Sequence, residues 1–445
     1  MSDPYQLAQA KPFRERRFGL FIHWGLYAMA ARNEWMRHRE RTTNEQYEQY
    51  FKHFCPDLYD PRDWVALAEQ AGMRYVVVTT KHHDGFCLWD SDATDYKATK
   101  TPWGRDLLAP LAAAVRERGL GLGLYHSLID WHHPDFPVDG LHPLRDSITP
   151  ELQAVRNPAA YRRYLHGQVR DLLTRYPDLQ ELWLDFSYTD HVHDGVPVWG
   201  GKGAADWGSE ELLAIVRQLQ PGILVNDRSG LPGDFVTPEQ YQPLEPLTRN
   251  GVPVLWEACQ TLNGSWGYDR DNQDFKSVPL LLRMLVDTVS KDGNLLLNVG
   301  PTARGEIDPT ARETLEGIGR WMRQHGRSIH EAGPSRFSPP PDCRYTQRGD
   351  RLYLHLFAWP FETVHLSGLA GKVRYAQFLH DGSEVQQEVS DPNQQAYATS
   401  PEAGPPGSLT LRLPVRQPAV EVPVIEIFLK PGADSSARLM GGEPS

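Results

Sequence analysis

Short apolar segments alternate with helical segments along the first three quarters of the chain, and this alternation constrains the fold more than any other feature. Each apolar segment has the length of a strand and ends in polar or aromatic residues. Seven such segments are predicted, at residues 18–24, 75–83, 121–127, 181–186, 223–228, 252–257 and 293–300. Strands that alternate with helices favour a parallel sheet. The pattern predicts a (β/α)8-like TIM barrel in which one strand is missed or degenerate.

The segments between these strands carry helix signals. Asp60 followed by Pro61 is typical of a helix start, with Asp as the N-cap and Pro in the first turn. Apolar residues then recur at helical spacing until Gly72, a common residue just past a helix end. An open doubly wound sheet is the alternative fold. It is disfavoured because no glycine-rich nucleotide fingerprint follows any predicted strand.

The pattern changes after Gly333. Residues 334–341 are rich in proline and predict a stiff link. Beyond the link, residues 351–357 and 409–413 alternate with period two, and no helical stripe follows. We therefore expect three parts: a catalytic (β/α)8-like barrel at 1–333, a C-terminal all-β sandwich at 334–432, and a disordered tail at 433–445.

The net charge, the apolar runs and the cysteines indicate which partners and which cellular compartment to expect. The net charge of −11 disfavours nucleic acid and anionic membranes as partners. The chain shows neither a signal peptide nor an apolar run long enough to cross a membrane. The four cysteines are scattered without metal-binding spacing, which predicts reduced thiols and a cytoplasmic protein. The sequence carries no signal for an oligomeric state.

The segment at 181–186 ends in a carboxylate. Side chains alternate along a strand, so Leu182 and Leu184 face one side while Trp183 and Asp185 face the other. A TIM barrel keeps its catalytic groups at the C-terminal ends of its strands, which makes Asp185 a catalytic candidate. A helix N-cap or a salt-bridged strand end is the structural alternative.

If the barrel is correct, the strand ends meet in one pocket rich in aromatic and imidazole side chains. The residues that would collect there are His23, Trp24, His82, His83, Trp89, Tyr125, Trp131, Asp185, Arg228, Glu257 and Trp266. Flat aromatic faces suit the C–H faces of a sugar ring, and His, Arg and Glu suit its hydroxyls. For any single Trp, core packing is the alternative.

The histidines raise the question of a metal. Adjacent His82 and His83 would point to opposite faces of a regular strand, so they are poorly placed to share one ion. His191 and His193 have same-face spacing, but residues 190–195 are predicted as loop, where a solvated pair is usual. We therefore predict no metal and no other cofactor.

Several segments together are similar to a known family. They are 18–27, 33–35, 80–89, 182–185, 225–228 and 293–301. In these segments the chain resembles the α-L-fucosidases of glycoside hydrolase family 29. The Lys81-His82-His83-Asp84 run and the 294–301 run are the most specific parts. The resemblance extends from about residue 17 to residue 337.

The resemblance implies a retaining exo-α-L-fucosidase that removes terminal fucose from oligosaccharides or glycoconjugates without a cofactor. It implies that Asp185 is the nucleophile. The substrate-binding residues expected around it are His23, Glu34, Trp35, His82, His83, Tyr125, Trp183, Arg228 and Trp266. The imidazoles of His82 and His83 are expected to donate hydrogen bonds to sugar hydroxyls.

The acid/base is assigned to Glu239, with Glu257 and Glu245 as rivals. A first-turn residue of a helix after Pro238 is the structural alternative for Glu239, and Glu257 could instead be a partner of Arg228. A retaining mechanism needs the two carboxyl groups about 5–5.5 Å apart. It also needs their pKa values pushed apart, with Arg228 or a protonated His holding the pKa of Asp185 low.

Two other functions remain open at this point. A metal-dependent barrel hydrolase would use the histidines and lose activity in chelator. A non-catalytic fucose-binding member of the family would bind the sugar without turnover.

Overall fold

The computed structural model describes residues 4–193, 196–389 and 407–433. The chain forms two compact units. The first comprises residues 1–243, 247–276 and 294–316, and the second comprises residues 244–246, 277–293 and 317–445. The expected boundary after residue 333 stays a prediction. Except for Ala433, the predicted tail at 433–445 lies outside the described residues.

The first unit contains an eight-stranded parallel sheet, in the order β7-β4-β3-β2-β1-β12-β11-β8. The strands are β1 (Phe18–Ile22), β2 (Tyr75–Lys81), β3 (Gly121–Ser127), β4 (Glu181–Asp185), β7 (Leu224–Val225), β8 (Phe235–Val236), β11 (Leu255–Thr261) and β12 (Asn294–Val299). A parallel bridge between Asn226 and Phe235 joins the two edge strands and closes the ring. The predicted barrel is therefore confirmed, and β8 is its missing eighth strand.

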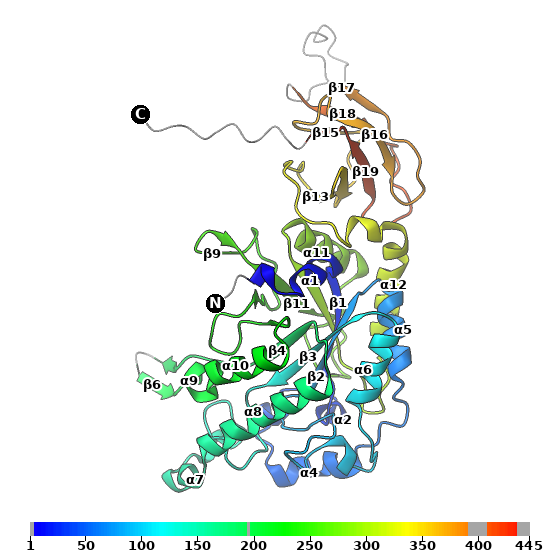
Figure 1. The fold of residues 1–445 in the computed structure, drawn as a ribbon. Coiled ribbons are helices and arrows are strands. Elements are labelled where there is room, and N and C mark those ends of the chain that lie inside the picture. The colour runs from blue at the N-terminus through cyan, green and yellow to red at the C-terminus, as the bar shows by residue number, and fades with distance from the viewer. Residues whose placement is uncertain (1–3, 194–195, 390–406, 434–445) are drawn as a thin grey trace, which may run out of the picture. The chain divides into compact units, whose positions relative to one another are not determined.

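Helices α5, α6, α8 and α10 flank strands β1 to β4 (Figure 1). The α-helices are α1 (Ala10–Arg16), α2 (Tyr27–Ala30), α3 (Met36–Arg39), α4 (Asn44–His53), α5 (Pro61–Gln70), α6 (Leu108–Glu117), α7 (Pro150–Ala154), α8 (Pro158–Arg175), α9 (Ala204–Trp207), α10 (Ser209–Leu219), α11 (Val278–Ser290) and α12 (Pro309–His325). Short 3-10 turns lie at Pro4–Gln6, Ala98–Lys100, Arg145–Ser147 and Gly326–Ser328. The predicted start of α5 is confirmed: the Asp60 side chain accepts the N–H of Arg62 at 2.9 Å.

The barrel is irregular between β7 and β11. Residues 226–234 connect β7 to β8 without a helix, and a small hairpin of β9 (Thr248–Arg249) and β10 (Val252–Pro253) separates β8 from β11. The predicted strand at 252–257 is therefore wrong at both ends. The barrel strand begins at Leu255 and continues to Thr261, past Glu257, where the predicted strand ended.

Large buried side chains fill the inside of the barrel. They include Phe21, Tyr75, Val77, Tyr125, Trp183, Phe235, Leu255 and Leu296, and Phe13 of α1 packs against Phe235. Gly19 leaves the space that the Tyr75 ring occupies, because a Cβ at Gly19 would lie 2.4 Å from that ring. The interior is a packed core, so the open space must lie at the strand ends.

The second unit contains two antiparallel sheets. The four-stranded sheet has the order β13 (Cys343–Arg348), β14 (Arg351–Leu356), β19 (Val424–Leu429) and β16 (Val373–Phe378). The three-stranded sheet has the order β15 (Thr363–Leu366), β18 (Leu409–Arg412) and β17 (Gln387–Val389). Alternate residues of both sheets form one buried cluster that includes Leu354, Leu366, Leu411 and Ile427. The predicted β-sandwich is confirmed.

The predicted loop at 190–195 is wrong in part. His191–His193 forms strand β5, which pairs antiparallel with β6 (Val196–Trp199). Residues 194–195 lie outside the described residues, as do the side chains of residues 193–199. Two strands this short carry too few residues to show an alternating apolar pattern, which accounts for the difference.

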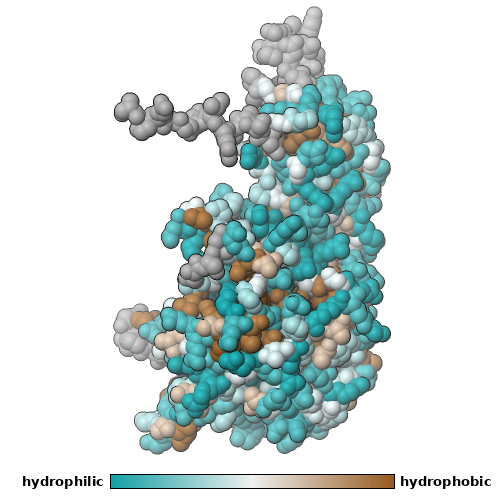
Figure 2. All heavy atoms as spheres, viewed as in Figure 1, coloured by the Kyte–Doolittle hydropathy of each residue, from teal (hydrophilic) through white to brown (hydrophobic). Residues whose placement is uncertain are grey.

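The face seen in Figure 2 is mainly hydrophilic, and its apolar residues gather in smaller groups. Within the described ranges, the chain has no helix with the length and hydropathy needed to cross a bilayer.

Candidate active site

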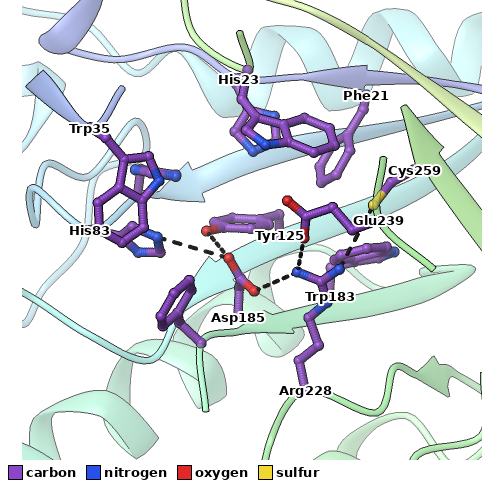
Figure 3. Close-up of a pocket in the computed structure, with 13 residues that line it drawn as sticks. Phe21, His23, Trp35, His83, Tyr125, Trp183, Asp185, Arg228, Glu239 and Cys259 are labelled. Carbon is purple, nitrogen blue, oxygen red and sulfur yellow. Dashed lines mark hydrogen bonds and ion pairs between the residues drawn. The ribbon is translucent and has the colours of Figure 1, made fainter. Parts of the chain in front are cut away.

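A pocket opens at the C-terminal ends of the barrel strands (Figure 3). It is lined by Phe21, His23, Trp35, His82, His83, Tyr125, Trp183, Asp185, Phe186, Arg228, Glu239, Cys259 and Trp266. Ten of the residues predicted from the sequence therefore meet here. The predicted residues that do not line the pocket are Trp24, Glu34, Trp89, Trp131, Glu245 and Glu257.

Asp185 ends β4 and is 7% exposed. Tyr125 Oη donates a hydrogen bond to its Oδ2 at 2.8 Å, and a terminal nitrogen of Arg228 lies 3.1 Å from its Oδ1. Burial raises the pKa of Asp185, the charge of Arg228 lowers it, and the nearby Glu239 carboxylate raises it. The net shift of the Asp185 pKa is upward, because burial outweighs the Arg228 cation and the Tyr125 hydrogen bond, although Arg228 lowers the pKa as expected.

The backbone that carries Arg228 is fixed by a side chain. The Asn226 amide donates to Leu184 O at 3.0 Å and accepts from Leu184 N at 2.9 Å, so it extends the pairing of β7 with β4 beyond Val225. Because Leu184 precedes Asp185, this pairing sets Arg228 beside the carboxylate. Thr237 also accepts a hydrogen bond from Arg228 Nε at 2.9 Å.

Glu239 approaches the same guanidinium from the other side. Its Oε2 lies 2.7 Å from the Arg228 nitrogen that also contacts Asp185, and its side chain is 39% exposed. The two carboxylate oxygens can therefore be at most about 6 Å apart, which fits the separation of a retaining pair. Residues 238–240 pair with Cys259 of β11, so no helix follows Pro238 and the helix reading of Glu239 is wrong.

The two rival carboxylates lie elsewhere. Glu257 is fully buried inside the barrel, where Tyr75 Oη and Trp183 Nε1 donate to it at 2.5 and 2.8 Å. It contacts Trp183 rather than Arg228. Glu245 is exposed, and it is not among the lining residues.

The tautomers of two pocket histidines follow from their partners. Asn298 donates its amide to Trp266 O at 2.7 Å, so its oxygen faces His23 and must accept from Nδ1–H at 2.7 Å. Ser127 donates to Ile129 O at 2.8 Å, so it accepts from His83 Nδ1–H at 2.7 Å. Burial lowers the pKa of His23 to about 3 and that of His83 well below its usual value. Each Nε2 is left as an acceptor.

This assignment corrects the prediction for His83. Its Nε2 lies 3.9 Å from Asp185 Oδ2 and carries a lone pair in this tautomer, so it can accept a hydrogen bond but cannot donate one. The neutral ring also leaves Arg228 as the cation that contacts Asp185. His82 has a buried Nδ1 without a hydrogen-bond partner, so its neighbours do not fix its tautomer.

His82 and His83 both line the pocket, although a regular strand would separate them. The strand β2 ends at Lys81, and the two rings lie 3.9 Å apart in the turn that follows. Gly85 makes this turn possible: its φ is +84°, and a Cβ would lie 2.2 Å from Asp130 Oδ1. In the part of the chain that the structure describes, no three His, Cys, Asp or Glu side chains are grouped to hold a metal ion.

Glu34 stands behind the pocket wall and not in it. It is buried, and its Oε2 accepts the N–H of Gly267 at 2.7 Å, which holds the turn that carries Trp266. Burial raises the pKa of Glu34 to about 7, against the Gly267 hydrogen bond. Trp35 is set by its own neighbour, because the Asn33 side chain accepts the N–H of Trp35 at 2.8 Å. These two turns each bring an aromatic side chain into the pocket lining.

Three of the predicted tryptophans pack outside the pocket. Trp24 stacks edge-on against Trp64, Trp89 donates to Asp171 at 2.8 Å, and Trp131 packs against Trp35. The structure adds lining residues that the sequence did not single out: Phe21, Phe186 and Cys259. Phe21 and Phe186 lie within or directly after predicted strands, which was the available signal. Cys259 lies beyond the predicted end of its strand.

A TIM barrel whose strand ends place two carboxyl groups about one guanidinium, in an aromatic pocket lined by neutral imidazoles, defines a glycoside hydrolase of the retaining type. Comparison with known proteins gives the family. Residues 3–327 match the family model described as alpha-L-fucosidase. The tissue alpha-L-fucosidase of Bos taurus is 32% identical over 381 residues, which cover 78% of this chain and 75% of that protein.

Solved structures similar to this chain are also α-L-fucosidases. Alpha-L-fucosidase isoenzyme 1 from Paenibacillus thiaminolyticus has a TM-score of 0.87 and 42% identity, covering 96% of this chain and 100% of that one. A GH29 alpha-L-fucosidase from Bacteroides thetaiotaomicron, trapped as a covalent intermediate with 2-fluoro-fucosyl fluoride, has a TM-score of 0.80 and 26% identity, covering 96% and 97%. The chain belongs to the α-L-fucosidase family.

Proposed function

We propose that this protein hydrolyses terminal α-L-fucosides of oligosaccharides or glycoconjugates by double displacement, with Asp185 as nucleophile and Glu239 as acid/base. One observation carries the assignment of the pair: a single nitrogen of Arg228 contacts Asp185 at 3.1 Å and Glu239 at 2.7 Å. These two contacts limit the distance between the carboxylate oxygens to at most about 6 Å, which is compatible with the separation that a retaining enzyme needs. The relative captured as a covalent intermediate supports the retaining route.

In the first step an Asp185 oxygen attacks the anomeric carbon while Glu239 gives its proton to the departing glycosidic oxygen. The C–O bond to the aglycone breaks, and a fucosyl ester forms on Asp185. The position of Glu239 suits this role, because its side chain is 39% exposed and can meet the aglycone at the pocket mouth. In the second step Glu239 takes a proton from water, which attacks the same carbon and releases fucose and free Asp185.

The remaining pocket residues hold the sugar. His23 and His83 accept hydrogen bonds from sugar hydroxyls at Nε2, and His82 and Tyr125 complete the polar side. Trp35, Trp183 and Trp266 supply the apolar faces. Arg228 offsets the charge of Asp185. Glu34 lies behind the pocket wall and accepts the N–H of Gly267, which holds the turn that carries Trp266.

The direct test uses p-nitrophenyl α-L-fucoside with the wild-type protein. We expect release of nitrophenol, and proton NMR early in the reaction should show α-fucose as the first product. The absence of nitrophenol release would contradict the proposal and favour a binding protein. A β-fucose first product would contradict the double displacement. Full activity after dialysis against EDTA is expected, and loss of activity that zinc restores would favour the metal-dependent alternative.

The cytoplasm is the proposed compartment. All four cysteines are free thiols in this structure, and Cys87, Cys259 and Cys343 are buried. Free thiols persist where glutathione keeps proteins reduced. Fractionation of the native host, with thiol labelling of the unfolded protein, tests this: four labelled cysteines in the cytosolic fraction are expected, and activity confined to a secreted or vesicular fraction would contradict it.

A further inference from the structure

Glu257 is a buried carboxylate that the two displacement steps do not use. It lies in the middle of β11, is fully buried, and accepts hydrogen bonds at both oxygens. Tyr75 Oη donates to Oε1 at 2.5 Å and Trp183 Nε1 donates to Oε2 at 2.8 Å. A buried carboxylate is costly to keep unless its partners need it, so its partners indicate what it does.

Trp183 connects Glu257 to the pocket. The indole N–H can only donate, so its position in the buried core depends on an acceptor, and Glu257 supplies that acceptor. The guanidinium of Arg228 lies over the face of the same ring, with its carbon 4.9 Å from the ring centroid. Arg228 in turn contacts both Asp185 and Glu239.

We propose that Glu257 is a positioning residue: it orients Trp183, and the face of Trp183 supports Arg228 between the two catalytic carboxyl groups. The inference rests on the proposed function for the roles of Asp185 and Glu239 and adds a residue that touches neither substrate nor reacting atoms. Glu257 is 0% exposed inside the barrel, and the inference predicts that its substitution alters the ionisation of Asp185 at the strand end.

The groups around the two carboxylates decide which substitutions are informative. Tyr75, Trp183, Glu181 and Cys259 face Glu257, and burial raises the pKa of both Glu257 and its neighbour Glu181. Gln at 257 would keep an oxygen toward Trp183 and turn its amide toward the Tyr75 hydroxyl. Leu would remove the acceptor. The proposed role of Glu257 requires a hydrogen-bond acceptor for Trp183 and not a negative charge. Gln keeps the acceptor without the charge and Leu removes both, so the two variants separate these requirements.

The pKa of Asp185 is the quantity that shows whether Arg228 has moved. Arg228, Glu239, His83 and Tyr125 face this carboxylate, and of these Arg228 is the group whose position Trp183 supports. If Arg228 moves away, the positive charge that opposes burial weakens. Asp185 then needs a higher pH to ionise, and the acid limb of kcat/KM moves upward.

The experiment measures kcat and KM across pH on p-nitrophenyl α-L-fucoside for Glu257→Leu and Glu257→Gln. For Glu257→Leu we expect kcat to fall about tenfold, KM to change less, and the acid limb to rise by about one pH unit. Glu257→Gln should keep the wild-type limb and kcat within about threefold. Glu181→Gln is the matched control, because Glu181 is equally buried but does not bond Trp183. It should leave the limb unmoved.

A second comparison tests the connection through the ring. In a Trp183→Phe background no indole N–H needs an acceptor, so the loss caused by Glu257→Leu should shrink to less than about threefold. An unmoved acid limb and unchanged kcat in folded Glu257→Leu would overturn the inference, as would equal losses in Glu257→Gln and Glu181→Gln. If Glu257→Leu does not fold, the Trp183→Phe double variant must fold and show the smaller loss, or the inference fails.

An inactive wild-type protein would refute the proposed function instead, and the crystal structure of Glu257→Leu would then decide the inference. Displacement of Trp183 and Arg228 from their wild-type positions would support it. Unchanged positions of both would overturn it.

Discussion

The two sides of the barrel differ in how they present their carboxylates. On one side, β1 to β4 are five to seven residues long and carry flanking helices, and Asp185 ends the last of them. On the other side, β7 and β8 have two residues each and no helix connects them, and Glu239 lies just past β8. The proposed nucleophile thus lies at the end of a regular strand, while the proposed acid lies on a short pairing at the irregular side.

This difference matches what each group must do. A nucleophile attacks from one fixed point and gains from a rigid position. A general acid must meet glycosidic oxygens that belong to different aglycones, and a side chain 39% exposed at the pocket mouth can do so. Arg228 joins the two sides, since it contacts both carboxylates. The predictions below test the two sides in order of expected effect.

The largest effect is expected on the regular side. Asp185→Asn removes the nucleophile but keeps the shape and the Tyr125 and Arg228 neighbours, so the fold should remain. We expect kcat to fall at least about 10³-fold, because no covalent intermediate can form. Steady-state kinetics measures the loss, and in an Ala variant azide should yield β-fucosyl azide. A variant that keeps a tenth of wild-type kcat would remove the assignment of Asp185.

The irregular side should respond according to the leaving group. Glu239→Ala should lose about 10³-fold on a natural fucosyl oligosaccharide but only about tenfold on p-nitrophenyl α-L-fucoside, whose phenolate leaves without a proton. Parallel kinetics on both substrates measures the ratio, and azide should restore turnover of the aryl substrate. Equal, small losses on the two substrates would show that Glu239 is not the general acid and would favour one of the rival carboxylates.

A third variant cuts the connection between the sides. Arg228→Met removes the cation that opposes the burial of Asp185. Asp185 attacks only when ionised, so activity is lost as pH falls through its pKa. Without Arg228 that pKa rises further, and the acid limb of kcat/KM should move about 1–3 units to higher pH. Arg228→Lys should move it less, because the charge remains. A limb at the wild-type pH in Arg228→Met would show that the cation does not control Asp185.

The smallest effect is expected for Glu245, a carboxylate outside the pocket that serves as a comparison for Glu239. Glu245 is exposed and lies six residues after Glu239, yet it does not line the site. Glu245→Gln should therefore keep kcat and KM within about twofold on both substrates, as exposed substitutions usually do. The same assays used for Glu239 measure it. A loss on the natural substrate alone would reveal a proton donor outside the described pocket.

The regular side was predictable from the sequence, whereas on the irregular side the segment 223–228 contained β7 but β8 was missed. Apolar runs revealed β1 to β4 and placed Asp185 at a strand end, because burial on both faces requires such runs. A two-residue strand such as β8 has no readable pattern. Glu257 was misplaced at a strand end because a buried carboxylate was read as the end of an apolar run, whereas β11 continues to Thr261 and Glu257 lies inside the barrel. The tautomers of His23 and His83 depend on contacts with Asn298 and Ser127, which lie far away in the chain.

The closing bridge between Asn226 and Phe235 makes the barrel a ring with a seam. Beside it, Asp234 supports the seam through its backbone and side chain, which both bond Val225, at 2.7 and 2.8 Å. The pairing that closes this edge is a single bridge, whereas β2 pairs with β3 along most of its length, so local opening should start here and the amides of β7 and β8 should exchange with solvent before those of β2 and β3. Each opening would release the segments that carry Arg228 and Glu239 while β3 still holds β4. A natively folded barrel would then spend brief intervals with its nucleophile in place and its acid absent.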